Sequence, residues 1–262
     1  MSKSSTVNQL FQSANEDGTL SSGALGALTS NDIGQQIQNA LMTNMDNVKA
    51  SEVILVTMMP DDSGSIKFEG NEQNVIDGHN LVIDSLIASK QKDNLFAHCR
   101  YLNGHILYPY IEIDKAKRMD KKNYKADKGT PLYDQSVILL GTVLAQTKIY
   151  EDEGIACRSV TLIITDGADE HSRDHTAKDV SLIVHDMLMT ENHIIAAMGI
   201  DDHMTDFKAV FQAMGIRDEW ILTPGNSQSE IRKAFNVFSQ SAVRASQSAV
   251  NFSKAAMGGF GA

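Results

Sequence analysis

Residues 53–65 read VILVTMMPDDSGS, an apolar run followed directly by a short polar loop. Four consecutive apolar residues, 53–56, are typical of a strand that is buried on both faces of a sheet. Three oxygen-bearing side chains follow the run in an Asp-x-Ser-x-Ser pattern: Asp61, Ser63 and Ser65. The stretch therefore predicts a buried strand with hydrophilic ligand groups at its carboxyl end.

From residue 51 onward, strand-like and helix-like segments alternate. The expected strands are 53–56, 95–102, 106–113, 160–165, 194–200 and 220–222, and the expected helices are 74–89, 135–150, 177–190, 206–214 and 227–250. Asn103-Gly104 is a strong hairpin signal, so one edge strand should be antiparallel. The order predicts an α/β fold with a doubly wound, mostly parallel six-stranded sheet and helices on both faces.

The 262 residues are enough for one large domain, or for one domain and an extension. Residues 1–48 are rich in Ser, Asn, Gln and Gly, which predicts a polar, partly helical N-terminal extension. Its apolar residues fall four apart, as on one face of a helix, at Ile33, Ile37, Leu41 and Met45. We expect the main domain over 49–240, followed by the end of a C-terminal helix and a small-residue tail over 241–262.

Charge and cysteine content narrow the functional classes. The net charge of −10 argues against nucleic-acid binding, which requires a basic face. No apolar run approaches the length of a membrane span, and no apolar signal core follows the first residues. Two cysteines, Cys99 and Cys157, cannot form a disulfide framework. These features predict a cytoplasmic protein.

Two further loops should reach the same edge of the sheet as Asp61. They are Gly129-Thr130-Pro131-Leu132, before a helix, and Thr165-Asp166-Gly167, after a strand. Together the three loops offer two carboxylates and three neutral hydroxyls, a set suited to Mg²⁺ or Mn²⁺. Because the hydroxyls carry no charge, the ion would keep an open position for an anionic oxygen. We expect an Asp or Glu from another molecule to fill it.

Asp61, Ser63, Ser65, Thr130 and Asp166 resemble, in order and context, the metal-ion-dependent adhesion site (MIDAS) of von Willebrand factor A (VWA) domains. The resemblance covers roughly residues 51–240. The strings Gly-Thr-Pro-Leu and Ile-Thr-Asp-Gly are similar to those of prokaryotic VWA proteins, including proteins of tellurium-resistance clusters and partners of AAA+ ATPases. The resemblance implies a VWA fold, bound Mg²⁺ or Mn²⁺, and a protein partner, such as an AAA+ ATPase or a stress-response or phage-defence complex. Pro60, before the first ligand, departs from the family pattern.

Two charged segments near these loops have more than one interpretation. The basic run 115–128 is most simply a solvated surface, although its place beside Thr130 would let it steer an acidic partner through Lys121, Lys122 and Lys125. Residues 169–175 contain His171 and His175, whose spacing would permit a second metal site. A solvated polar rim is the favoured interpretation of that segment.

A binding module is the leading functional hypothesis. No His, Lys or Cys in the three loops is an evident base or nucleophile, so we expect no enzymatic activity. A metal-dependent hydrolase is the rival hypothesis, with His171 as the nearest candidate base. A structural subunit of a polymeric or phage-like assembly is a third, suggested by the polar N-terminal segment and the Ser/Ala-rich tail.

Overall fold

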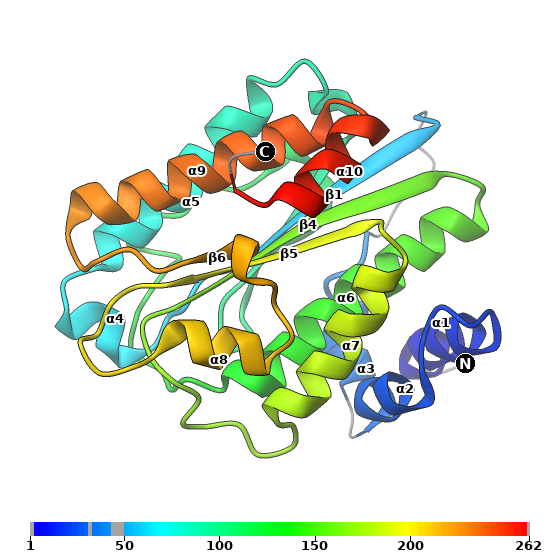
Figure 1. The fold of residues 1–262 in the computed structure, drawn as a ribbon, viewed down its shortest axis with the longest axis horizontal. Coiled ribbons are helices and arrows are strands. Elements are labelled where there is room, and N and C mark those ends of the chain that lie inside the picture. Colours follow the sequence, from blue (N-terminus) through cyan, green and yellow to red (C-terminus); the bar gives the residue numbers. More distant parts are fainter. Residues whose placement is uncertain (1–2, 31–32, 43–49, 261–262) are drawn as a thin grey trace.

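A computed structural model describes residues 3–30, 33–42 and 50–260. Within these residues the strands form one six-stranded sheet of order β3-β2-β1-β4-β5-β6 (Figure 1). The strands are β1 (Glu52–Met59), β2 (Leu95–Arg100), β3 (Ile106–Glu112), β4 (Ala156–Thr165), β5 (His193–Gly199) and β6 (Ile221–Leu222). Only the β2–β3 pair in this sheet is antiparallel. The predicted fold class, with an antiparallel edge at the Asn103-Gly104 turn, is confirmed.

Helices cover both faces of the sheet, and the three layers are visible in Figure 1. One face carries α5 (Glu72–Ile87), α9 (Gln228–Ser246) and α10 (Ala249–Gly258), and the other carries α6 (Leu132–Asp152), α7 (Ala177–Met189) and α8 (Phe207–Ala213). A short helix, α4 (Gly64–Phe68), follows β1. None of the described helices is both long enough and apolar enough to cross a membrane.

The central strands are apolar because both of their faces are covered. Every residue of β1 after Glu52 is buried, and so is every residue of β5. The helix layer above them is tightly packed at Gly78 of α5, where an added Cβ would lie 2.2 Å from the Phe235 ring of α9. Burial of this continuous apolar layer holds the strand ends, and hence the loops after them, in fixed positions.

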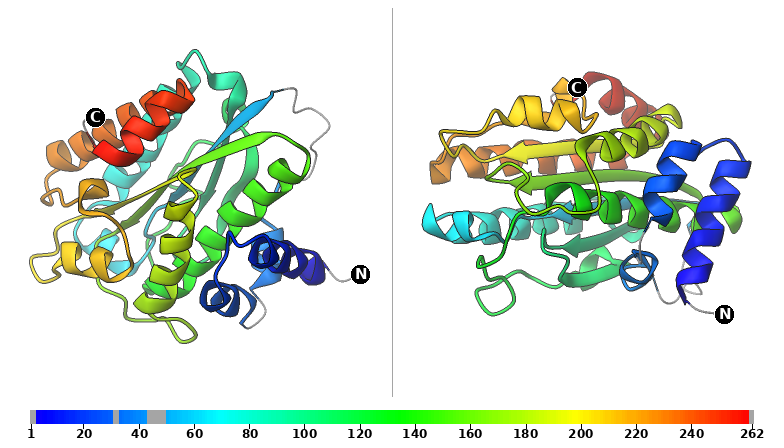
Figure 2. Two further views of the ribbon diagram at one scale, coloured as in Figure 1. Left: turned by 45° about the vertical axis from the view of Figure 1, so that its right-hand side comes forward. Right: turned by 90° about the horizontal axis from the view of Figure 1, so that it is seen from below.

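The N-terminal segment consists of three helices, α1 (Lys3–Glu16), α2 (Ser22–Thr29) and α3 (Gly34–Gln38). Figure 2 shows them against the layer formed by α6 and α7. The closest approach is at Gly141 of α6, where an added Cβ would lie 2.8 Å from Leu28 and 2.9 Å from Ile37. The segment therefore covers an apolar helix face that would otherwise be exposed.

The single amphipathic helix expected from Ile33 to Met45 is much shorter in the structure. Ile33, Ile37 and Leu41 are buried as their spacing predicts, but α3 ends at Gln38. Met45 lies outside the described residues. Helices α1 and α2 were not predicted individually, because α1 is polar on average and α2 is short and contains two glycines. Tertiary packing rather than a strong periodic pattern stabilises them.

The expected helix 227–250 is two helices. Ser246 ends α9, and the Ser248 hydroxyl accepts a hydrogen bond from Asn251 N, at 3.1 Å, to begin α10. Serine favours this N-cap position over a helix interior because its side chain bonds free backbone N–H groups. Helix α10 buries Phe252, and beyond it Phe260 packs edge-on against Trp220 with ring centroids 4.7 Å apart.

Candidate metal centre

The three predicted loops meet at one edge of the sheet. Strands β1 and β4 are parallel and in register from Glu52 with Ala156 to Met59 with Ile163, so the loops that follow them emerge side by side. The loop before α6 joins them because Gly64 N donates to Lys128 O at 2.9 Å, and Ser63 forms a bridge with Lys128. The topology thus places all five predicted ligands on neighbouring loops.

Hydrogen bonds connect four of the five predicted ligands directly. Asp166 Oδ1 accepts from Ser65 Oγ at 2.6 Å and from Ser63 Oγ at 3.4 Å, and the two serine hydroxyls are 2.8 Å apart. Asp61 Oδ1 accepts from Ser63 N at 2.7 Å, while its Oδ2 accepts from Thr165 Oγ1 at 2.7 Å. Two carboxylates and two hydroxyls are therefore held as one cluster, before any ion is considered.

The cluster concentrates negative charge where solvent is largely excluded. Asp61, Asp62 and Asp166 are each at most 2% exposed. Burial raises the pKa of Asp61, and it raises the pKa values of Asp62 and Asp166 to about 7, with the charge of Asp61 adding to both. Ion pairs among the described residues include none with these three acids. A bound cation would compensate this charge.

The residues present fit a hard divalent cation. Asp166 Oδ2 is buried and has no hydrogen-bond partner among the described residues, although its other oxygen accepts from both serines. Leaving a buried charged oxygen unpaired is costly, so the position is suited to a cation. All the candidate donors in the cluster are oxygens, which Mg²⁺ and Mn²⁺ prefer over the nitrogen and sulfur ligands typical of zinc.

Thr130 is nearly buried and is positioned by the segment after Asp166. Its N–H donates to His171 Nδ1 at 3.0 Å, and its carbonyl accepts from Glu170 N and His171 N. The preceding residue must be small, since a Cβ on Gly129 would lie 2.8 Å from the His171 ring. The structure thus fixes the Thr130 backbone against the segment that follows Asp166, and the role of the Thr130 hydroxyl as a ligand remains a prediction.

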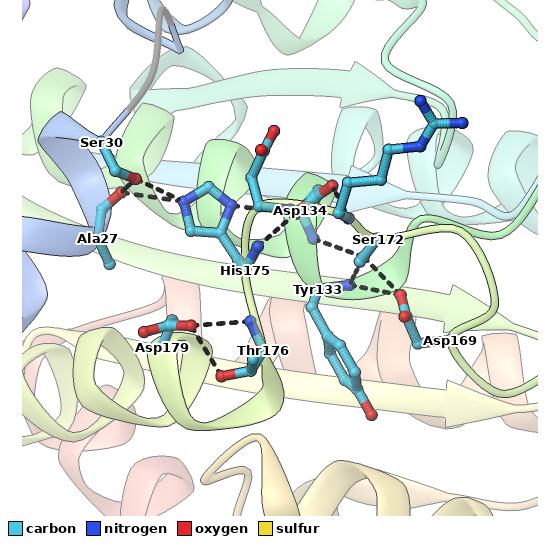
Figure 3. Close-up of polar contacts among 11 residues, drawn as sticks. Ala27, Ser30, Tyr133, Asp134, Asp169, Ser172, His175, Thr176 and Asp179 are labelled. Atoms are coloured by element: carbon cyan, nitrogen blue, oxygen red, sulfur yellow. Dashed lines mark hydrogen bonds and ion pairs between the residues drawn. The ribbon is translucent and has the colours of Figure 1, made fainter.

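Residues 169–175 form a belt around the start of α6 (Figure 3). Ser172 Oγ accepts from Tyr133 N at 3.1 Å and Asp134 N at 3.0 Å, and it donates to Asp169 Oδ1. In return, the Asp134 carboxylate accepts from three consecutive backbone N–H groups, those of residues 173–175. Ser172 thus accepts from free backbone N–H groups at the start of α6, and Asp134 accepts from backbone N–H groups of the belt. The segment is therefore an ordered, hydrogen-bonded structure rather than only a solvated rim.

His175 extends the belt to the N-terminal helices. Its Nδ1 lies 3.1 Å from Asp134 Oδ1, and its Nε2 lies 2.9 Å from Ser30 Oγ and 3.1 Å from Ala27 O (Figure 3). Ser30 Oγ also donates to Ala27 O at 2.8 Å. The contacts from Ser30 through His175 to Asp134 therefore hold the end of α2 against the belt. No group of three or more His, Cys, Asp or Glu in the described part of the chain is arranged to hold a metal. The structure thus gives both belt histidines structural partners.

Two supporting residues were missed by the sequence analysis. The Tyr124 hydroxyl donates to the backbone carbonyl of Asp61, and the Asp62 carboxylate accepts from Asn103 N at 3.0 Å in the hairpin. The Asp62 carbonyl also accepts from Asp127 N and Lys128 N. Asp62 occupies a variable position of the Asp-x-Ser-x-Ser pattern, and only the long-range pairing shows that it holds three loops together.

The basic run lies beside this cluster. Lys121, Lys122 and Lys125 are exposed, and the ion pairs between described residues include none of them. Lys121 and Lys125 line a cavity of about 220 Å³ together with Lys67 of α4. Their side chains are therefore available to a partner at this edge.

Comparison with known proteins identifies the fold. No protein-family model matches the sequence, and no curated protein matches it significantly. Solved structures do match. Proximal thread matrix protein 1 from the mussel byssus, with a zinc-occupied MIDAS motif, has a TM-score of 0.53 at 16% identity over 75% of this chain and 47% of that one. The pilus adhesin SpaC from Lactobacillus rhamnosus GG, in its open conformation, has a TM-score of 0.51 at 14% identity over 78% of this chain and 31% of that one.

The present chain thus spans less than half the length of either structure. At these identities the similarity shows a shared fold. The chain has the VWA-type α/β fold that the resemblance implied.

Proposed function

We propose that this chain is a cytoplasmic, metal-dependent protein-binding module. Its Mg²⁺ or Mn²⁺ is held by Asp61, Ser63, Ser65, Thr130 and Asp166, and a partner's Asp or Glu completes the coordination. The observation that carries the proposal is the hydrogen-bonded cluster of Asp61, Ser63, Ser65 and Asp166. Its two acids are buried and have no ion-pair partner among the described residues, and one oxygen of Asp166 also has no hydrogen-bond partner among them. The zinc-occupied MIDAS motif of a mussel protein with the same fold supports it.

The surrounding residues prepare the site for a partner. Ser63 N and Thr165 Oγ1 hold both oxygens of the Asp61 carboxylate, and Tyr124 holds its backbone carbonyl. The serine hydroxyls orient Asp166 and contribute no charge. When bound, the cation supplies an electrophilic centre for an anionic oxygen. Because the neutral donors leave its charge undercompensated, a carboxylate from outside is the preferred additional ligand.

We propose a binding role and no catalytic one. The two histidines nearest the site are engaged elsewhere: His171 accepts from a backbone N–H, and His175 bridges Asp134 and Ser30. These contacts support a structural role for both histidines. The partner class suggested by the sequence resemblance, an AAA+ ATPase or a stress-response or phage-defence complex, remains part of this proposal.

The metal-bridge hypothesis is tested by affinity capture from native lysate in magnesium and again in chelator. We expect a protein retained only in magnesium, and we expect Asp61→Ala and Asp166→Ala to lose it while their circular dichroism spectra stay native. The matched control is Asp93→Ala, an exposed acid just before β2 at the opposite end of the strands. Normal magnesium-dependent capture by the two site variants would contradict the hypothesis.

We also propose that the basic run speeds association with an acidic partner. Long-range attraction acts on the association rate more than on dissociation, and salt screens it. Neutralising Lys121, Lys122 and Lys125 should therefore lower the association rate of the captured partner and its salt dependence, as measured by surface plasmon resonance. If neither the lysine substitutions nor the salt concentration changes the association rate, the run is ordinary solvated surface.

A further inference from the structure

An exposed aromatic ring stands beside the metal loop. Phe68, the last residue of α4, is 88% exposed. Its ring Cε2 lies 3.5 Å from the position that a Cβ would take on Gly64, between two of the predicted ligands. Isolated exposed apolar side chains are common, but this one is in contact distance of the loop that would hold the ion. We expect a partner bound at the ion to contact this ring.

A basic cavity lies beside the same short helix. It has a volume of about 220 Å³, and its walls are three lysines, two acids and three other residues: Lys67, Lys121, Lys125, Glu72, Asp127, Ile76, Tyr124 and Ala126. The ion pairs of the described residues include none with the three lysines. With three lysines and two acids, the lining of the cavity has a net positive charge, on a chain whose net charge is −10.

The cavity and the metal loop are parts of one hydrogen-bonded unit. Tyr124 forms part of the cavity wall, and its hydroxyl donates to the carbonyl of Asp61. Lys67 comes two residues after Ser65 on the same turn of chain. A peptide of a few residues whose carboxylate reached the ion could therefore place a neighbouring side chain in the cavity.

We infer that Phe68 and the lysine-lined cavity, together called the α4 surface, recognise an acidic protein segment with two carboxylates and an apolar side chain. One carboxylate completes the metal coordination, the second enters the cavity, and the apolar side chain covers Phe68. The inference rests on the proposed function. Charge complementarity identifies the occupant, because three lysines against two acids give the cavity a net positive charge close to a site that itself selects a carboxylate.

The lysines and Phe68 contribute differently to the binding of such a segment. Exposed ion pairs contribute little affinity each, so the lysines mainly select acidic segments and orient them. Covering an exposed aromatic ring buries apolar area, and aromatic side chains near the centre of an interface carry much of its affinity. The second acid and the apolar residue therefore give specificity that a single metal-bound carboxylate lacks.

Selection from a displayed library of random dodecapeptides on the full chain, in magnesium, tests the inference. We expect the selected peptides to be enriched in pairs of acidic residues with an adjacent apolar residue. Binding of synthetic copies of these peptides should weaken at least tenfold in the Lys121→Glu/Lys125→Glu variant and in Phe68→Ser. The matched control is Lys90→Glu/Lys92→Glu, the same charge change at exposed positions near the opposite end of the strands.

The results separate this inference from the proposed function. Peptides that need magnesium and Asp61 but bind as tightly with one acid as with two would overturn the inference and leave the metal bridge in place. An equal effect of the site and control charge reversals would overturn it as well. Peptides that bind equally in chelator and to Asp61→Ala would instead contradict the proposed function itself.

Discussion

Replacing Asp166 with asparagine should stabilise the metal-free protein. Burial and the neighbouring charge of Asp61 raise the pKa of Asp166 from 3.8 to about 7. Since this acid titrates higher in the folded state than in the unfolded state, the stability of the metal-free protein falls as pH rises from 3.8 to 7, and the whole penalty is present above pH 7. A shift of this size corresponds to about 4 kcal/mol, as an upper limit.

Part of that gain is offset by the new amide. Asparagine can keep the hydrogen bond that Ser65 donates to Oδ1, at 2.6 Å. Its NH₂ group, however, would occupy the position of Oδ2, which is buried and has no partner among the described residues. A buried unpaired donor costs about 1–3 kcal/mol. The expected net stabilisation of the metal-free protein is therefore about 1–3 kcal/mol.

Urea unfolding at pH 8, in chelator and in millimolar magnesium, measures both effects. Magnesium at a hundred times its dissociation constant should stabilise the natural protein by about 2.7 kcal/mol and should have little effect on the Asp166→Asn variant. Asp93→Asn, at an exposed position, should change neither measurement. The reasoning is refuted if Asp166→Asn is less stable than the natural protein in chelator, or if magnesium stabilises both equally.

Three further changes test the packing, a buried histidine and the belt. Burial lowers the pKa of His193 to about 4, so the natural protein loses stability as pH falls from 6.5 towards 4. In urea unfolding, the free energy of unfolding of His193→Gln should therefore fall by about 2 kcal/mol less than that of the natural protein between pH 7.5 and pH 5. Gly78→Ala should cost about 1–3 kcal/mol in the same assay because its Cβ would meet a ring of α9, whereas Gly26→Ala, with open space around it, should cost nothing. His171→Ala removes the acceptor of the Thr130 N–H and should weaken magnesium binding in calorimetry while the fold is retained.

The fold was predictable because its strands are apolar on both faces and its turns are local. The run 53–56 lies within β1, and Asn103-Gly104 joins β2 and β3, as their residue types indicate. Helix α5 likewise follows a clear apolar pattern. The break at Ser248 was missed because a serine also fits an exposed helix position, and only the packing of Phe252 and Phe260 shows that the chain turns there.

The candidate site was predictable to the level of its loops. The spacing of Asp61, Ser63 and Ser65 is a local pattern, and parallel strands bring the loops after β1 and β4 to one edge. The supports that Thr165, Tyr124 and Asn103 provide were not predictable, since each is a pairing between distant parts of the chain. Tyr124 lies 63 positions from the carbonyl that it holds.

The belt 169–175 shows why charged loops are hard to interpret from sequence alone. Its composition is typical of a solvated rim, yet Ser172 and Asp134 exchange hydrogen bonds with each other's backbone segments, and His171 holds Thr130. The same belt reaches Ser30 through His175. Hydrogen bonds at both ends of the segment 171–175 thus connect the N-terminal helices, through the covalent chain of that segment, with a predicted metal ligand. Because coupling is reciprocal, any effect of the docked helices on metal affinity must be matched by an equal effect of the metal on their docking.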